Sequence, residues 1–279
     1  MLFVMLAVLG LILGSFANAL VWRLHEQAEL TGKKSRAAAK RRRALSITRG
    51  RSMCTHCGHE LAAKDLVPVF SWLWLRGKCR YCGSQIAWQY PVVEVTTGLL
   101  FVVSYVAWPH ALHGVGLLQF IFWLAFLVGF IALVIYDVRW MLLPDRIVFP
   151  LVGLAILQLI VTVLWQRNFE TIWQSAAGAA VIFGLFWGLY QISAGHWIGG
   201  GDVKLSLVLG LLAGTPLRAL TVIFFASLAG TLMSIPQLIQ GKKGLGKHVP
   251  FGPSLLLSVV IVVLWGTSIT NWYQTLVLK

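Results

Sequence analysis

The stretch MLFVMLAVLGLILGSFANALVW, Met1 to Trp22, contains no charged residue. A helix that crosses a bilayer needs about 20 consecutive apolar residues, whereas a barrel strand needs only about 10. The stretch has no basic segment ahead of its apolar run and no evident small-residue cleavage site. We therefore interpret it as a retained first transmembrane helix rather than a signal peptide.

The remainder of the 279-residue chain continues this pattern, with 58% hydrophobic and only 11% charged residues. Charged residues make up about a quarter of an ordinary soluble protein. Further apolar runs follow at about 92–108, 115–136, 147–165, 172–192, 203–215, 217–236 and 251–273. The sequence thus predicts an all-α polytopic membrane protein with about eight transmembrane helices. The run at 203–215 is short, which predicts a tilted or partly unwound helix there.

The basic residues predict the orientation of these helices. The chain has 23 Lys and Arg residues against 9 Asp and Glu, and fourteen of the 23 lie between Arg23 and Arg80. Basic loops face the cytoplasm, and alternation then makes 137–146, 193–204 and 237–249 cytoplasmic as well. Twenty basic residues fall on that side, and both termini face away from it. This distribution favours a membrane-surface role for the charge, and we expect no nucleic-acid partner.

We predict three parts: a first span at 1–22, a cytoplasmic insert at 23–90 and a membrane-embedded catalytic domain at 91–279. The insert begins with a basic run, KKSRAAAKRRR, from Lys33 to Arg43. Such a run is typical of a solvated segment near an anionic leaflet. Contact with an acidic partner is the alternative interpretation.

Two cysteine pairs follow in the insert, Cys54-Thr-His-Cys57 and Cys79-Arg-Tyr-Cys82, each followed directly by glycine. Two such knuckles can direct four thiolates at one tetrahedral Zn²⁺. His59 as a replacement ligand, two disulfides or a redox couple are the alternatives, although the cytoplasm disfavours stable disulfides. A shell of four cysteines would be closed, so the metal is expected to fold the insert rather than to perform chemistry.

Aspartates are scarce, and three of the four (Asp137, Asp145 and Asp202) lie at the predicted cytoplasmic ends of spans. They are either ordinary interface charges, capping helices or paired with Arg139, Arg146 and Lys204, or a catalytic group. Two facing carboxylates share a proton, so one activates water while the other protonates a carbonyl. The glycines before Asp202, in GHWIGGGDVKL, would let a substrate backbone approach closely.

Other functions remain open at this point. An ion-coupled transporter could use the same Asp and Lys residues beside a discontinuous, glycine-rich helix. A scaffold with a zinc domain would not require the aspartates. The clustering of the acids at one membrane face favours hydrolysis over transport.

Motifs along nearly the whole chain resemble the type IV prepilin peptidase family, the leader peptidases/N-methyltransferases of type IV pilus and type II secretion systems. The motifs are Gly14 to Asn18, Val67 to Glu94, Asp137 to Asp145, Gly199 to Lys204 and Val249 to Pro253.

The resemblance implies a multi-pass protein of the bacterial inner membrane whose catalytic face is cytoplasmic. It implies Asp137 and Asp202 as the catalytic pair of an aspartyl protease. It further implies Cys54, Cys57, Cys79 and Cys82 as metal ligands. The supporting residues are Gly199, Gly201, Lys204, Asp145 and Glu94. The expected substrates are prepilins or pseudopilins, with the pilus or secretion machinery as a further partner. S-adenosylmethionine is the expected methyl donor for the new N-terminus.

Overall fold

The structure is a computed structural model that describes residues 1–32, 35–47, 50–239 and 250–277. The chain forms two compact units, Met1–Val106 and Ala107–Lys279, and each is described by itself. Several residues of the predicted topology lie outside the described ranges: Lys33, Lys34, Arg49, Lys242, Lys243, Lys247 and Lys279.

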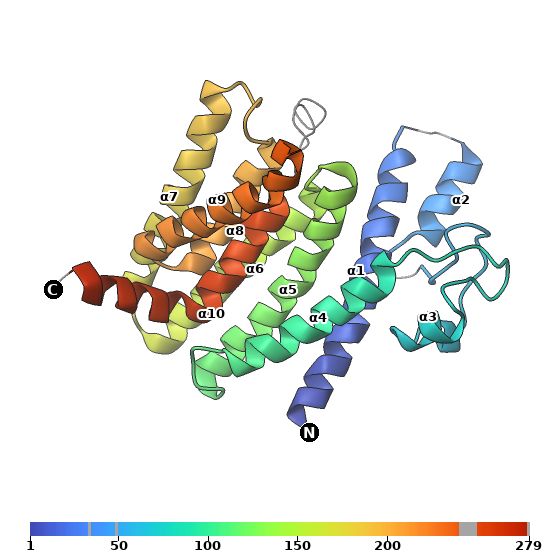
Figure 1. Ribbon diagram of the computed structural model, residues 1–279, viewed down its shortest axis with the longest axis horizontal. Coiled ribbons are helices and arrows are strands. Elements are labelled where there is room, and N and C mark those ends of the chain that lie inside the picture. The colour runs from blue at the N-terminus through green and yellow to red at the C-terminus, as the bar shows by residue number, and fades with distance from the viewer. Residues whose placement is uncertain (33–34, 48–49, 240–249, 278–279) are drawn as a thin grey trace. The chain divides into compact units, whose positions relative to one another are not determined.

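The described ranges are almost entirely helical, and they hold two isolated β-bridges but no strand (Figure 1). Seven of their helices are long and apolar enough to cross a bilayer. These are α1 (Leu2–Glu29), α4 (Gln89–Val106), α5 (Gly114–Trp140), α6 (Asp145–Gln166), α7 (Glu170–Ile192), α9 (Pro216–Ile239) and α10 (Gly252–Val277). The predicted all-α polytopic membrane fold is confirmed.

The eighth predicted span is the short helix α8, Gly200–Ala213, with 14 residues. At 1.5 Å per residue it is roughly 21 Å long, against about 30 Å for the hydrocarbon layer. Its side chains are nevertheless central, since Leu205, Val208 and Leu209 have no exposed surface. Helix α8 packs on α6, α7, α9 and α10. The helix is continuous from Gly200 to Ala213, so the partly unwound form predicted for this run is wrong, and its tilt stays a prediction.

The first unit is built on the pairing of α1 with α4. Glycines allow their backbones to approach closely: a Cβ at Gly10 would lie 2.7 Å from the Cα of Gly98, and one at Gly14 would lie 2.9 Å from the Cα of Glu94. Small residues four apart are a common helix-packing device in membranes. This pairing places Glu94 directly against the first helix.

The insert between these helices contains α2 (Arg36–Ala44), a 3₁₀ turn η1 (Ala63–Asp65) and the short helix α3 (Phe70–Trp74). Arg23 of α1 is buried and donates to the carbonyl oxygens of Ser46, Ile47 and Gly50. These bonds tie the end of the basic helix α2 back to α1.

The second unit contains α5 to α10, and its sharpest corner joins α5 to α6. Met141 adopts a left-handed conformation at φ 53°, and its amide N–H closes α5 by donating a hydrogen bond to the carbonyl oxygen of Asp137. Pro144 then precedes α6, where a preset φ and a missing N–H are tolerated. The four-residue corner brings Asp137 and Asp145 to the same end of the helix bundle.

Candidate functional site

Three helix ends of the second unit carry the predicted aspartates. Asp137 lies in the last turn of α5, Asp145 is the first residue of α6, and Asp202 lies in the first turn of α8. The glycine segment packs on the α5–α6 corner, since a Cβ at Gly201 would lie 2.9 Å from Cβ of Leu143. All three carboxylates are therefore at one end of this unit.

Asp137 is buried, with 6% of its surface exposed. Its Oδ2 accepts a hydrogen bond of 3.0 Å from the amide of Gly252, the first residue of α10. Helix N-termini present unpaired N–H groups and a partial positive charge, both of which favour a carboxylate. Helix α10 therefore holds this oxygen in one position.

Asp202 lies beside the glycines. The backbone of Gly199 hydrogen-bonds to its carboxylate, and a Cβ at Gly199 would lie 3.3 Å from Oδ2. Asp202 is outside the seven candidate spans. Burial, as the larger cause, and the negative charge of Asp137 together raise its pKa to about 7. The charge of one carboxyl group thus affects the pKa of the other, which is the condition for sharing one proton.

Asp145 has a different partner. Lys204, two residues after Asp202, places its Nζ 2.7 Å and 2.9 Å from the two carboxylate oxygens of Asp145. The same ammonium lies 5.6 Å from the ring centroid of Phe149. Asp145 thus forms an exposed ion pair that links α6 to α8. Pairing with a basic residue, one of the two interpretations of these aspartates, therefore applies to Asp145. Asp137 and Asp202 are instead coupled electrostatically to each other.

The four cysteines of the first unit form a cluster whose Sγ atoms all lie within 4.8 Å of one another. All four are free thiols rather than disulfides. This set can hold a metal ion, and four sulfur ligands within such a distance suit tetrahedral Zn²⁺. His59 is not part of the cluster. Its ring instead contacts that of Tyr81 in a tilted arrangement, at a centroid distance of 3.7 Å.

The two knuckles have the same backbone design. Cys54 N–H donates to His59 and Cys79 N–H donates to Ser84, while Gly58 and Gly83 donate back to the first cysteine of each pair. Both glycines have φ of 71°. That conformation is unfavourable for residues with a Cβ, so each knuckle needs the glycine that follows its second cysteine.

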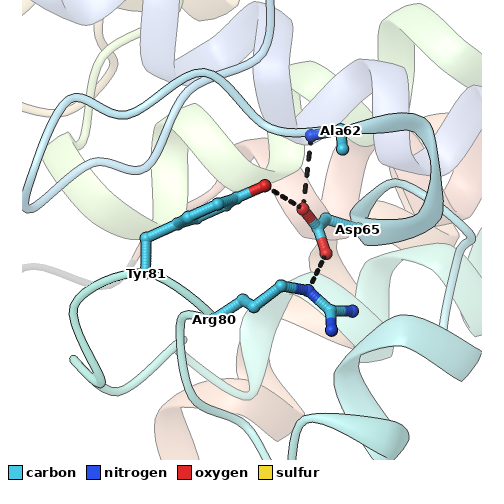
Figure 2. Close-up of polar contacts among 4 residues, drawn as sticks. All are labelled: Ala62, Asp65, Arg80 and Tyr81. Carbon is cyan, nitrogen blue, oxygen red and sulfur yellow. Dashed lines mark hydrogen bonds and ion pairs between the residues drawn. The ribbon is translucent and has the colours of Figure 1, made fainter.

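Asp65 braces the second knuckle (Figure 2). Its carboxylate accepts from Arg80 Nε at 2.6 Å, from the Tyr81 hydroxyl at 3.0 Å and from the Ala62 amide at 3.2 Å. Burial raises the pKa of Asp65, but these hydrogen bonds outweigh burial and leave the pKa below its ordinary value. The residues between Cys79 and Cys82 are therefore fixed by a carboxylate from outside the knuckle.

Glu94 lies in the first unit, apart from the aspartates in sequence, and is 6% exposed. Its Oε2 accepts a hydrogen bond of 2.7 Å from the amide of Val69, and the Ser15 side chain also hydrogen-bonds to it. Glu94 therefore joins α1, α4 and the segment that leads into α3. Sequence reasoning singled out Glu94 but gave no role to Val69 or Gly252, which lie within quoted motifs and whose contacts become visible only in the tertiary structure.

Two family models match the chain. Residues 8–108 match the Bacterial Peptidase A24 N-terminal domain, and residues 124–235 match the Type IV leader peptidase family. The first match contains Glu94 and the cysteine cluster, and the second contains the three clustered aspartates.

Curated relatives extend the likeness to most of the chain. A protein of Stutzerimonas stutzeri named prepilin leader peptidase/N-methyltransferase is 32% identical over 95% of this chain and 91% of its own length. Proteins of the same name from Aeromonas hydrophila and Pseudomonas aeruginosa are 36% and 30% identical, over 81% and 95% of this chain and 75% and 91% of their own lengths. No solved structure gives a significant match.

Proposed function

Because this chain belongs to the type IV leader peptidase family, we propose that it cleaves the basic leader from prepilins or pseudopilins at the cytoplasmic face of the bacterial inner membrane. It then methylates the new N-terminal amine. The names of its relatives support both reactions. The observation that carries the peptidase proposal is the placement of Asp137 in the last turn of α5 and Asp202 in the first turn of α8, at one end of the second unit. The effect of the Asp137 charge on the pKa of Asp202 supports it.

The proposed roles follow from the different surroundings of the two carboxyl groups. Asp202 holds a proton near neutral pH and donates it to the oxygen of the scissile carbonyl. Asp137, oriented by the Gly252 amide, takes a proton from the attacking water. The new C–O bond forms as that proton leaves, the C–N bond of the tetrahedral intermediate then breaks, and the amine departs with a proton returned by the pair.

The segment Gly199–Gly201 is the proposed resting place for the substrate backbone. Residues without Cβ let an extended peptide approach closely enough for main-chain hydrogen bonds. Leu143 already contacts the position where a side chain at Gly201 would project. A larger residue at this position would therefore displace either the α5–α6 corner or the substrate.

The cytoplasmic placement rests on charge. Arg139, Arg146 and Lys204 occur at the aspartate end of the second unit, whereas Arg167 and Arg218 lie at the opposite ends of their helices. Under the positive-inside rule, this asymmetry supports a cytoplasmic position for the aspartates. A basic prepilin leader would meet its cleavage site on the same side.

For the metal we propose a structural Zn²⁺ held by Cys54, Cys57, Cys79 and Cys82. Bound zinc would cross-link the two knuckles and so stabilise the fold of a segment that has few buried apolar side chains. The protein residues set the ligand positions through the two glycine turns and the Asp65 brace. S-adenosylmethionine would supply the methyl group for the second reaction, and we assign no residue to its binding.

The decisive experiment incubates purified full-length protein with a prepilin and measures product masses with and without S-adenosylmethionine. We expect leader loss in both samples and a further mass increase of one methyl group only with the cofactor. Asp137→Asn and Asp202→Asn should each abolish leader loss, with non-additive effects in the double variant.

The matched control is Glu170→Gln, the same kind of change at an acid in the first turn of α7. It should cleave normally. Near-normal cleavage by either aspartate variant would remove that residue from the proposed pair. Absence of cleavage by the wild-type chain, together with proton- or sodium-coupled uptake in vesicles, would favour the transporter interpretation instead.

A further inference from the structure

Helix α3 of the insert exposes a compact apolar face. Phe70, Leu73 and Trp74 are 68%, 58% and 85% exposed, and their spacing places them on the same side of the helix. Trp88, the residue immediately before α4, is also 69% exposed. Contiguous exposed apolar side chains of this size mark an interaction surface. We call Phe70, Leu73 and Trp74 the α3 face.

Two contacts attach this face to the beginning of α4. The rings of Trp72 and Trp88 lie 4.1 Å apart between centroids, and Trp88 is the residue immediately before α4. The amide of Val69, which precedes α3, donates to Glu94 in the second turn of α4. Glu94 is roughly 8 Å along the helix axis from Gln89, at 1.5 Å per residue. Helix α3 thus lies beside the first two turns of α4.

The turn after α3 makes this attachment rigid. Trp72 Nε1 donates to the carbonyl of Ile86 at 3.1 Å. Gly77, with φ of 68°, donates its amide to the carbonyl of Trp72, and a Cβ at Gly77 would lie 2.9 Å from the Trp72 ring. Trp72 therefore faces inward while its neighbours on α3 face outward.

The position of the α3 face beside α4 and the basic residues near it indicate which kind of surface covers this face. Helix α4 is a candidate membrane span that begins at Gln89, so the α3 face lies at the level where the chain enters the bilayer. Tryptophan is the preferred side chain at that level. Residues 66–93 include Arg76 and Lys78 and no acidic residue, and this charge matches an anionic leaflet. Arg80 in the same segment is already paired with Asp65.

We propose that the α3 face is an in-plane membrane anchor, in which Phe70, Leu73 and Trp74 enter the headgroup–acyl boundary of the leaflet where α4 begins. Amphipathic segments bind this boundary through buried apolar area and attraction to anionic lipid. The anchor holds the cysteine cluster at the membrane surface. The benefit of that placement, access to the freshly exposed N-terminus of an apolar pilin helix, rests on the proposed function above.

The test uses full-length protein with the photo-cross-linking residue benzoylphenylalanine in place of Phe70 or Trp74. The protein is reconstituted in liposomes of phosphatidylethanolamine and phosphatidylglycerol, irradiated, and analysed by mass spectrometry. We expect lipid adducts at both positions. The matched control carries the same residue at Gln85, which is exposed on the second knuckle, and should give few lipid adducts.

The proposal would be overturned if position 70 or 74 cross-linked to peptides of residues 107–279 or to a second copy of the chain. It would also be overturned if lipid adducts were equally rare at positions 70, 74 and 85. A second measurement compares wild type with Trp74→Phe in liposomes of brominated lipid. The difference in fluorescence between the two proteins is the emission of Trp74. This emission should be quenched by the bromines and poorly quenched by aqueous acrylamide, and the reverse pattern would refute the anchor. Neither readout depends on peptidase or methyltransferase activity.

Discussion

The amide of Gly252 donates a 3.0 Å hydrogen bond to Oδ2 of Asp137, across 115 positions of sequence. The approach leaves no room for a side chain, because a Cβ at Gly252 would lie 2.6 Å from the same oxygen. Helix α10 therefore positions Asp137 with its first N–H group, and a larger residue at position 252 would have to displace the carboxylate.

The first prediction is that Gly252→Ala impairs cleavage severely. The added methyl must displace the Asp137 carboxylate, and a displacement of about 1 Å in a reacting group can lower the rate about a hundredfold. The rate of leader removal is the measurement. The control is Gly188→Ala in α7, where an added Cβ meets nothing within 4 Å. Equal rates for the two variants would argue against a positioning role for Gly252.

The second prediction concerns the ion pair between Asp145 and Lys204. Because both partners are about half exposed, breaking the pair should lower the free energy of unfolding by only about 0.2–1 kcal/mol. Asp145→Asn and Lys204→Gln should therefore reduce cleavage by similar, modest factors, and the double variant should be no worse than either single variant. If Asp145→Asn alone is inactive while Lys204→Gln is active, Asp145 takes part in the chemistry.

Much of the fold could be predicted from the sequence, because apolar runs of span length leave the backbone few alternatives in lipid. Helices α1, α4, α5, α6, α7, α9 and α10 all fall where such runs occur. The limited length of α8 was also predictable from its run. The insert was not predictable beyond its cysteine knuckles, since α3 is a five-residue helix in a segment without helical periodicity.

The candidate site was predictable in composition but not in its contacts. The topology alone places three aspartates at one membrane face, and it does not distinguish which two interact. The Asp145–Lys204 pair and the Gly252–Asp137 bond both join helices distant in sequence. Such contacts depend on how α6, α8 and α10 pack, and no local pattern encodes that packing. For the same reason the Val69–Glu94 bond could not be predicted.

The third prediction concerns pH. Burial and the nearby Asp137 raise the pKa of Asp202 to about 7, so Asp202 loses its proton as the pH rises through that value. Cleavage needs this proton, and kcat/KM should therefore fall about tenfold per unit above pH 7. A rate that stays constant from pH 6 to pH 9, measured with saturating and limiting prepilin, would contradict the assignment of Asp202 as the acid.

The same shift has a consequence for stability. A carboxyl group whose pKa is raised by folding destabilises the folded protein when it is ionised. The free energy of unfolding therefore decreases as the pH rises from the ordinary pKa of the group to about 7, and the loss is complete above that pH. Asp202→Asn should therefore raise the thermal unfolding temperature relative to wild type at pH 8, and much less at pH 4. An equal effect at both pH values would mean that burial of charge is not the cause.

The fourth prediction concerns the brace at the metal site. Asp65→Asn removes the charge that accepts from Arg80 and Tyr81, and hydrogen bonds to a charged group contribute about 1.5–3 kcal/mol. The variant should transfer its metal to a chelator faster than wild type and should be cut more readily by protease within residues 50–90. Glu60→Gln is the control, because Glu60 pairs with Arg51 in a well-exposed contact at 3.4 Å. Equal metal release by both variants would show that Asp65 does not brace the knuckle.

The fifth prediction is that the two proposed activities can be separated. The aspartate pair lies in the unit Ala107–Lys279, whereas Glu94 and the cysteine cluster lie in the unit Met1–Val106. Methyl transfer needs a neutral amine aimed at a sulfonium methyl group, and the amine exists only after cleavage. Asp137→Asn should therefore fail on intact prepilin and still methylate a pre-cleaved pilin supplied with S-adenosylmethionine.

The converse variant is Glu94→Gln, which weakens the bond that holds Val69 and leaves both aspartates in place. It should lower methylation of pre-cleaved pilin more than it lowers leader removal, and mass measurements on the two substrates test both effects. Circular dichroism and metal content would establish that each variant is folded. If folded Asp137→Asn loses methyl transfer as well, the two reactions share a site, because a carboxylate needed only for hydrolysis has no role in transferring a methyl group to an existing amine.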